Sequence, residues 1–126
     1  PMAITYDPHW LELWEKRFDD PLTDAETFRM SKNRTLLEIG KKPTSIDEIE
    51  GQYMGLIKFT PNAWRKVELL RASCTAVERN HMHMTGLLQM IIDRTNMDIS
   101  AVPYESEWGE VDTIHDLKFY RSWAPR

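Results

Sequence analysis

The sequence predicts an α/β domain, built as a mixed sheet with flanking helices and an inserted β-hairpin, and three observations support this prediction. Short apolar stretches with strand-like composition alternate with stretches whose apolar residues recur at three- and four-residue spacings. An Asp-Pro or Thr-Pro pair begins two of the helix-like stretches. A polar segment separates two strand-like stretches, as in a hairpin. This order of elements is typical of a layered sheet.

The N-terminal region is predicted to form a strand followed by a helix. Residues 2–6 are apolar and partly β-branched, which favours a strand. Asp7-Pro8 then supplies an N-cap and a first helical residue, so we expect a helix over residues 8–18 that ends before Asp20-Pro21. Its apolar residues would form one buried stripe: Trp10, Leu11, Leu13, Trp14 and Phe18.

The next predicted elements are a hairpin and a long strand. Residues 26–30 and 35–39 flank the polar segment 31–34, and we expect them to pair as two antiparallel strands. Residues 53–59 are apolar on both faces apart from Lys58. Such a run is typical of a strand in the interior of a sheet that is covered on both sides.

Two helices, two strands and a last helix are predicted after residue 59. In chain order they are a helix over 61–77 begun by Thr60-Pro61, a helix capped by Thr85 and extending to about Arg94, a strand over 99–104, a strand over 108–111 and a helix opening at Thr113. Residues 113–116 resemble a capping box with Asp in place of Glu. Cys74 falls on the apolar face of the first of these helices, which favours a small core residue.

Composition and charge predict a single domain over residues 1–126 and exclude several partners. The chain is 41% hydrophobic and 29% charged, without internal repeats or low-complexity stretches. Its formal charge of −4 attracts neither nucleic acid nor an anionic membrane, so we expect no nucleic-acid and no membrane partner. A lone cysteine, the lack of a long apolar run and the lack of a signal peptide favour the cytoplasm.

Asp112 is the first candidate for a site. Common catalytic signatures, such as a Gly-rich phosphate loop, HExxH, CxxC or a Gly-x-Ser-x-Gly elbow, do not occur in the chain. Asp112 stands where a predicted strand passes into a helix, with Glu110 and Asp116 close in sequence. A carboxylate in that place can hold Mg²⁺ and the phosphates it bridges. The alternative is a solvated acidic helix start that complements the helix dipole.

Weaker candidates each have an ordinary alternative. His81 and His83 lie on one side of an extended segment and can grip a transition metal or simply face water. Lys41 and Lys42 form a small cationic point that can hold a phosphate or be solvated.

Further candidates concern a cationic ligand and the N-terminus. Asp24 and Glu26 can pair with an ammonium group or decorate an exposed turn. An N-terminal proline such as Pro1 serves tautomerases as a base, but here it precedes a native-looking initiator, Met2. An aromatic cage for a cation, with core packing as the alternative, would draw on Trp10, Trp14, Trp64 and Trp108.

A series of short motifs runs through nearly the whole chain in a fixed order. In sequence they are Ala3-Ile4-Thr5-Tyr6-Asp7; Trp10, Trp14 and Arg17; Asp20-Pro21-Leu22 with Asp24-Ala25-Glu26-Thr27-Phe28; Ile39-Gly40-Lys41-Lys42-Pro43; Gly51-Gln52-Tyr53-Met54-Gly55-Leu56; Met84-Thr85 before Leu87-Leu88; and Trp108-Gly109-Glu110-Val111-Asp112-Thr113 with Asp116-Leu117. This series resembles the C-terminal half of nucleotidyltransferases, in the branch of sugar-phosphate and phosphocholine or phosphonate cytidylyltransferase-like enzymes.

The resemblance implies half of a Rossmann-like three-layer domain and a reaction. Such enzymes transfer a nucleotidyl group from a nucleoside triphosphate to a phosphate or phosphonate acceptor and release pyrophosphate with the help of Mg²⁺. By matching motif, Asp112 is similar to the second metal-binding aspartate and Lys42 to a lysine that meets the acceptor phosphate. The resemblance also implies acceptor contacts for the strand residues Gly51, Tyr53 and Gly55 and for the carboxylates Asp24 and Glu26.

The chain departs from the family because the nucleotide-binding motifs of the other half are missing. It has no Gly-rich loop with its arginine, no base-reading residues and no first metal-binding aspartate, and His83 stands where relatives carry an acidic residue. We therefore expect a half domain that is inactive alone, with Mg²⁺ bound only if the missing half is supplied. Its expected partners are a second copy, an N-terminal-half partner or a phosphorylated or ammonium-bearing small molecule. The alternative is a homo-oligomeric ligand-binding or interaction module without catalysis.

Overall fold

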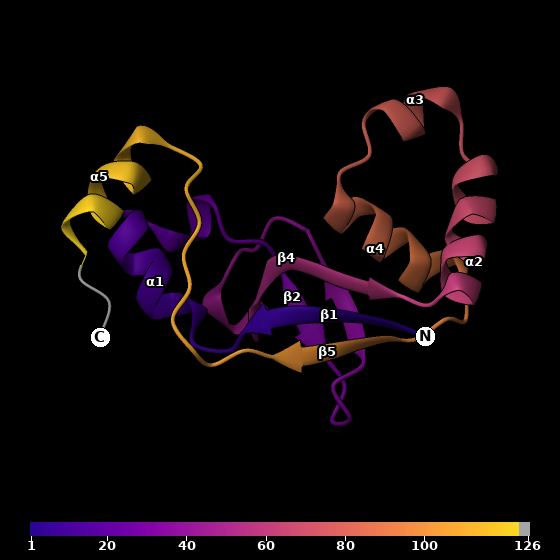
Figure 1. Ribbon diagram of the computed structural model, residues 1–126, viewed down its shortest axis with the longest axis horizontal. Coiled ribbons are helices and arrows are strands. Elements are labelled where there is room, and N and C mark those ends of the chain that lie inside the picture. Colours follow the sequence, from indigo (N-terminus) through magenta and orange to yellow (C-terminus); the bar gives the residue numbers. More distant parts are fainter. Residues whose placement is uncertain (124–126) are drawn as a thin grey trace.

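A three-stranded mixed sheet forms the centre of the molecule in the computed structural model, which describes residues 1–123. The sheet contains β1 (Met2–Asp7), β4 (Gln52–Phe59) and β5 (Ile99–Pro103) in the order β4-β1-β5. β1 pairs antiparallel with β4 and parallel with β5 (Figure 1). The prediction of a mixed sheet in an α/β domain is confirmed.

The position of β4 in the sheet corrects one prediction. The strand predicted over 53–59 exists, but it lies at an edge of the three-stranded sheet, and β1 takes the interior place. Tyr53, Ile57 and Phe59 pack against the core, whereas Leu56 is 64% exposed. An apolar run does not distinguish a strand with neighbours on both sides from an edge strand, because periodicity reports the faces of a strand and not its edges.

The predicted hairpin is confirmed, with shorter strands. β2 (Phe28–Met30) pairs antiparallel with β3 (Leu36–Ile39), between the first helix and β4 in the chain. The hairpin contacts the main sheet through its turn, where the Ala101 amide donates to the Arg34 carbonyl at 2.8 Å. Arg34 has a φ of 58°, which allows the chain to reverse at that point. The hairpin therefore lies beside β5 and does not hang free.

Five α-helices flank the strands in the described part of the chain. α1 (Trp10–Arg17) and α5 (Ile114–Ser122) lie at one end, and α2 (Pro61–Ala72), α3 (Ala76–Asn80) and α4 (Met84–Arg94) lie at the other (Figure 1). Short 3₁₀ turns cover Pro21–Thr23 and Ile46–Glu48. Within residues 1–123, no helix has both the length and the apolar character that crossing a bilayer requires.

Several helix boundaries differ from the predictions. The helix predicted over 61–77 breaks in two, because Thr75 caps α3 by accepting a hydrogen bond from the Glu78 amide at 3.1 Å. Asp7 belongs to β1, and the N-cap of α1 is His9. Similarly, α4 begins one residue before the predicted cap Thr85.

Near the C-terminus one strand prediction fails and one helix prediction succeeds. Residues 104–113 carry no regular secondary structure, so the strand predicted over 108–111 is wrong. The capping box of α5 is confirmed: the Thr113 hydroxyl accepts from the Asp116 amide and the Asp116 carboxylate accepts from the Thr113 amide. The polar caps were therefore better guides in this region than the apolar residues.

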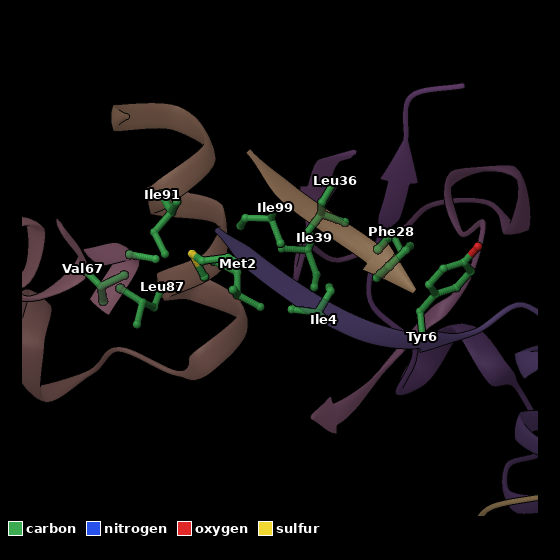
Figure 2. Close-up of a cluster of buried hydrophobic side chains, with 13 residues drawn as sticks. Met2, Ile4, Tyr6, Phe28, Leu36, Ile39, Val67, Leu87, Ile91 and Ile99 are labelled. Atoms are coloured by element: carbon green, nitrogen blue, oxygen red, sulfur yellow. The ribbon is translucent and has the colours of Figure 1, made fainter. Parts of the chain in front are cut away.

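Two clusters of buried apolar side chains form the interior. The larger one lies between the sheet, the hairpin and the helices α2 and α4; Figure 2 shows, among others, Met2, Ile4, Tyr6, Phe28, Leu36, Ile39, Val67, Leu87, Ile91 and Ile99. The smaller one surrounds α1 and contains Trp10, Trp14, Ala25 and Ile49, with Trp108 packed against it. Cys74 is buried, as predicted, but Trp64 is 40% exposed and does not face the core.

Candidate functional site

A cavity of about 200 Å³ opens at the junction of α1, the hairpin, β4 and segment 104–113. Four carboxylates line it, together with three aromatic rings and three other side chains: Asp24, Glu26, Glu110 and Asp112; Trp14, Phe28 and Tyr53; and Thr27, Ile39 and Gln52. None of these lining residues is Lys or Arg. We call this space the acidic cavity.

Hydrogen bonds hold the Asp24 carboxylate and the Glu26 backbone on the hairpin side of the acidic cavity. The Trp14 indole Nε1–H donates to Asp24 at 3.0 Å, which ties α1 to the loop before β2. Gln52, the buried first residue of β4, donates to the Glu26 carbonyl at 2.7 Å and accepts from the Glu26 amide at 3.1 Å. This reciprocal pair fixes the backbone at Glu26 against the end of β4.

A buried arginine lies behind the other two carboxylates. Arg17, at the end of α1, donates from Nε and Nη2 to the Asp116 carboxylate, both at 2.9 Å, and the side chains of both residues are 0% exposed. Nη2 also donates to Asp112 at 3.2 Å, and Nη1 lies 3.7 Å from a Glu110 carboxylate oxygen. The rings of Trp14 and Phe18 lie 5.2 and 4.8 Å from the guanidinium carbon.

Burial and neighbouring charges shift the pKa values of the carboxylates in this region, some upward and one downward. Burial raises the pKa of Glu26, which the Thr85 hydroxyl and His83 partly oppose. Burial also raises the pKa of Glu110, and the nearby Asp112 carboxylate adds to this effect. The hydrogen bonds from Arg17, in contrast, hold the pKa of Asp116 well below its ordinary range. Crowded carboxylates with raised pKa values favour the entry of a cation.

The structure brings four of the predicted site residues together and leaves three apart. Asp24, Glu26, Tyr53 and Asp112 all line the acidic cavity. The remaining predicted residues, Lys42, Gly51 and Gly55, are not among the residues that line it.

Each of the three residues outside the acidic cavity has a local setting of its own. Lys42 is exposed, and its neighbour Lys41 pairs with Glu38 at 3.2 Å. A Cβ at Gly51 would collide with the Tyr6 ring, so Gly51 serves the packing of β1 against β4. Gly55 has a φ of +86°, with nothing within 4 Å of the place where a Cβ would lie. The surroundings of Gly55 are therefore open, and its backbone conformation is what requires glycine.

The residues at Asp112 do not by themselves complete a magnesium site. Within residues 1–123, no group of three or more His, Cys, Asp or Glu side chains is arranged to hold a metal ion. Asp112 already accepts a hydrogen bond from Arg17, and its side chain is 55% exposed. His81 and His83, the other predicted metal candidates, also belong to no such group in that range. Asp112 can therefore offer one carboxylate to an ion whose other ligands come from elsewhere.

The sequence motifs include Arg17 but predict no role for the arginine that organises this region. A signal was present, because Arg17 follows Trp14 by three residues and so falls on the buried face of α1. A cation on an apolar helical face indicates a buried anionic partner, although spacing cannot say which of the twenty Asp and Glu residues it is.

Comparison with known proteins gives the class of this chain. The resemblance to cytidylyltransferase-like enzymes that the motifs indicated is confirmed, and the similarity is to part of such an enzyme. It is 40% identical over 123 residues to a CTP:phosphoglutamine cytidylyltransferase of Campylobacter jejuni, with 93% of this chain and 48% of that protein covered. The chain thus spans about half the length of this relative.

Other comparisons add no further relative. No protein-family model matches the chain, and no solved structure is significantly similar to it. The sequence relationship and the geometry of the acidic cavity are therefore the two supports for a function.

Proposed function

We propose that this chain is the acceptor-binding part of a nucleotidyltransferase, and that the acidic cavity takes an ammonium group of a phosphorylated acceptor. The whole enzyme transfers a nucleotidyl group from a nucleoside triphosphate to that acceptor, and this chain contributes half of a Rossmann-like domain to it. The observation that carries the proposal is the convergence of four carboxylates on one cavity, in a chain similar to a cytidylyltransferase.

The chemistry of the acidic cavity narrows the class of acceptor. Four carboxylates without a Lys or Arg among the lining residues repel a phosphate and attract a positive group. Trp14 is buried and its ring already lies over the Arg17 guanidinium, so the half-buried Tyr53 ring is the one that would stabilise an ammonium group. A phosphorylated amine or quaternary ammonium compound fits this site better than a sugar phosphate. Its phosphate would point out of the cavity, where contact with the exposed Lys42 stays a prediction.

A titration with three small molecules tests this proposal. Phosphocholine and choline should bind and shift the NMR signal of the Trp14 indole N–H, because that group donates to Asp24 at the cavity. Glucose 1-phosphate, which lacks the cation, should not bind. Glu26→Gln should weaken phosphocholine binding about tenfold through the loss of one carboxylate. Glu78→Gln, on α3, removes a carboxylate outside the acidic cavity and serves as the control.

The outcome can contradict the proposal in two ways. If glucose 1-phosphate bound as tightly as phosphocholine, the carboxylates would not select a cationic acceptor. No binding of either cation at millimolar concentration would remove the acceptor role of the acidic cavity.

The catalytic part of the proposal requires the other half of the enzyme. Asp112 would be one ligand of Mg²⁺, with the remaining ligands supplied from outside this chain. The chain alone should therefore release no pyrophosphate from CTP and an acceptor. Asp112→Asn should leave folding nearly unchanged, because the side chain is 55% exposed, but should weaken Mg²⁺ binding once the other half is added. Turnover by this chain alone would contradict the division of roles. Binding without turnover in the presence of the other half would favour a module without catalysis.

The free edge of β4 is the proposed contact with a partner. β4 has eight residues and pairs on one side with β1, and no other described strand pairs with its outer edge. An open edge of this length with the exposed Leu56 beside it invites another strand. The other half of the enzyme would continue the sheet there, and a second copy of the chain would do so in its absence. Light scattering should show a dimer at tens of micromolar that Leu56→Lys weakens; a monomer would contradict this contact.

A further inference from the structure

We propose that Arg17 is a positioning residue, which holds the carboxylates of Asp112 and Glu110 at the rim of the acidic cavity. The consequence for ligand binding rests on the proposed function, whereas the positioning itself rests on contacts in the chain. Arg17 is not among the residues that line the cavity, so it would act through those two carboxylates.

The inner side of the Arg17 guanidinium is anchored. Its Nε and Nη2 donate to the two oxygens of Asp116 at 2.9 Å each. The Asp116 carboxylate in turn accepts from the backbone amides of Asp112 and Thr113 at 3.0 and 3.1 Å. Since Asp116 is fixed by the capping box of α5, the guanidinium is placed relative to the backbone of Asp112. A bidentate pair of this kind has a well-defined geometry.

The outer side of the guanidinium faces the two carboxylates of the cavity. Nη2 donates to Asp112 at 3.2 Å, so this residue is held by its side chain as well as by its amide. Nη1 is buried and has no hydrogen-bond partner, while a Glu110 oxygen lies 3.7 Å away. An unsatisfied buried N–H group is costly. A small inward movement of Glu110 would satisfy it.

Other contacts hold the backbone and the tryptophan of segment 104–113: the Glu110 amide donates to the Tyr120 hydroxyl at 3.0 Å and the Trp108 indole N–H donates to Asp7 at 2.7 Å. The contacts of Arg17 matter because they reach the carboxylates of Glu110 and Asp112 themselves. Residues 104–113 have no regular secondary structure, and the Glu110 and Asp112 carboxylates repel each other. A cation between them and Asp116 offsets that repulsion.

Trp14 links Arg17 to the hairpin side of the cavity. Its ring lies over the guanidinium, and its indole N–H donates to Asp24. Arg17 therefore connects both walls of the acidic cavity.

The test replaces Arg17 by lysine, which keeps the charge but has no planar fork. In the unliganded wild type, NMR couplings should show Asp112 in a single χ1 rotamer. In Arg17→Lys, with a folded circular-dichroism spectrum, Asp112 should average between rotamers, and affinity for choline should fall about tenfold. Lys16→Gln, which changes an exposed cation one residue away on α1, should match the wild type in both measurements.

The possible outcomes separate this inference from the proposed function. An unchanged Asp112 rotamer and unchanged choline affinity in Arg17→Lys overturn the positioning role. Averaging of Asp112 in the wild type overturns it as well. A wild type that shows an ordered Asp112 lost in Arg17→Lys, but binds no choline, supports the positioning role and contradicts the proposed function.

A measurement on the wild type covers the case in which Arg17→Lys does not fold. The ¹⁵N-resolved signals of the Arg17 guanidinium should show slow rotation about the Cζ–Nη2 bond, because Nη2 donates to both Asp116 and Asp112. Fast averaging of those protons would overturn the inference without any variant.

Discussion

The two ends of this molecule are stabilised by different interactions. At the α2–α4 end, strands and helices meet through aliphatic side chains such as Met2, Leu88 and Ile91, each at most 1% exposed. At the α1–α5 end, the rings of Trp14 and Phe18 lie over a buried ion pair between Arg17 and Asp116. The first end can exchange similar apolar side chains with modest loss. The second depends on particular atoms, since a buried charge without its partner is strongly destabilising.

This difference shows that specific side-chain geometry is concentrated beside the acidic cavity. The acidic cavity lies against α1 and segment 104–113, and one of its carboxylates, Asp112, accepts a hydrogen bond from the arginine of the ion pair. A buried ion pair is weak evidence for stability, because desolvation offsets much of the attraction. Its presence beside the cavity is better explained by the placement of Asp112 and Glu110.

The largest effect should come from breaking the ion pair. Asp116→Ala leaves Arg17 buried without its main partner and should cost about 3–5 kcal/mol of unfolding free energy, measured by urea denaturation. Glu78→Ala removes the exposed partner of Arg94, which lies 3.5 Å away, and as a control should cost at most about 0.5 kcal/mol. Equal effects of the two variants would show that the α1–α5 end does not depend on this pair.

A core truncation at the other end should be nearly as costly. Leu88 on α4 is 0% exposed, and Leu88→Ala should lower the unfolding free energy by about 3 kcal/mol through lost burial and the cavity left behind. Leu69→Ala on α2 is the matched control, because Leu69 is 73% exposed. A loss below 1 kcal/mol at Leu88, on the order of a surface substitution, would mean that this core is loosely packed.

The third effect is the response to acid. The pKa of Asp116 is lowered in the folded chain. Its contribution to the unfolding free energy is therefore present above pH 3.8, the ordinary pKa, and is lost as the pH falls through the folded pKa. Glu26 and Glu110 have raised pKa values in the folded chain. Their contribution to the unfolding free energy is therefore present at low pH and is lost as the pH rises through those raised pKa values.

Unfolding free energy measured against pH should therefore rise slightly on mild acidification. Below pH 3.8 it should then fall by about 1.4 kcal/mol per pH unit for the one proton at Asp116. Glu110→Gln should reduce the increase in unfolding free energy on mild acidification and leave the decrease below pH 3.8 unchanged. A stability that falls steadily from neutral pH would contradict the raised pKa values of the cavity carboxylates.

The smallest effect should come from the β4 edge. Gly55→Val places a β-branched residue at a φ of +86° and should cost about 1–3 kcal/mol through backbone strain, since no neighbour lies within 4 Å of the new Cβ. Gly86→Ala, in α4 with equally open surroundings, should instead stabilise by about 0.5–1 kcal/mol. The melting temperatures of the two variants should move in opposite directions; a wild-type melting temperature for Gly55→Val would contradict the strain.

Local signals in the sequence predicted much of the secondary structure. Thr60 and Thr113 cap helices as expected, and the polar segment 31–34 turns the hairpin. Between residues 61 and 77 the apolar spacing favoured one long helix, whereas the polar Thr75 favoured a new helix start. The cap prevailed, because Thr75 begins α3. Helical spacing also placed Trp10 and Trp14 in the interior, where both are buried.

Residue type and spacing by themselves determined most of the elements, the mixed α/β class and the resemblance to a nucleotidyltransferase half, because capping, periodicity and motif order act over short stretches of chain. The tertiary structure decided that β4 lies at an edge, that Asp24, Glu26, Tyr53 and Asp112 share one cavity, and that Arg17 pairs with Asp116. The physical reason is that these are contacts between distant segments. Arg17 and Asp116 are 99 residues apart, and no local pattern specifies which charges meet once the helices pack.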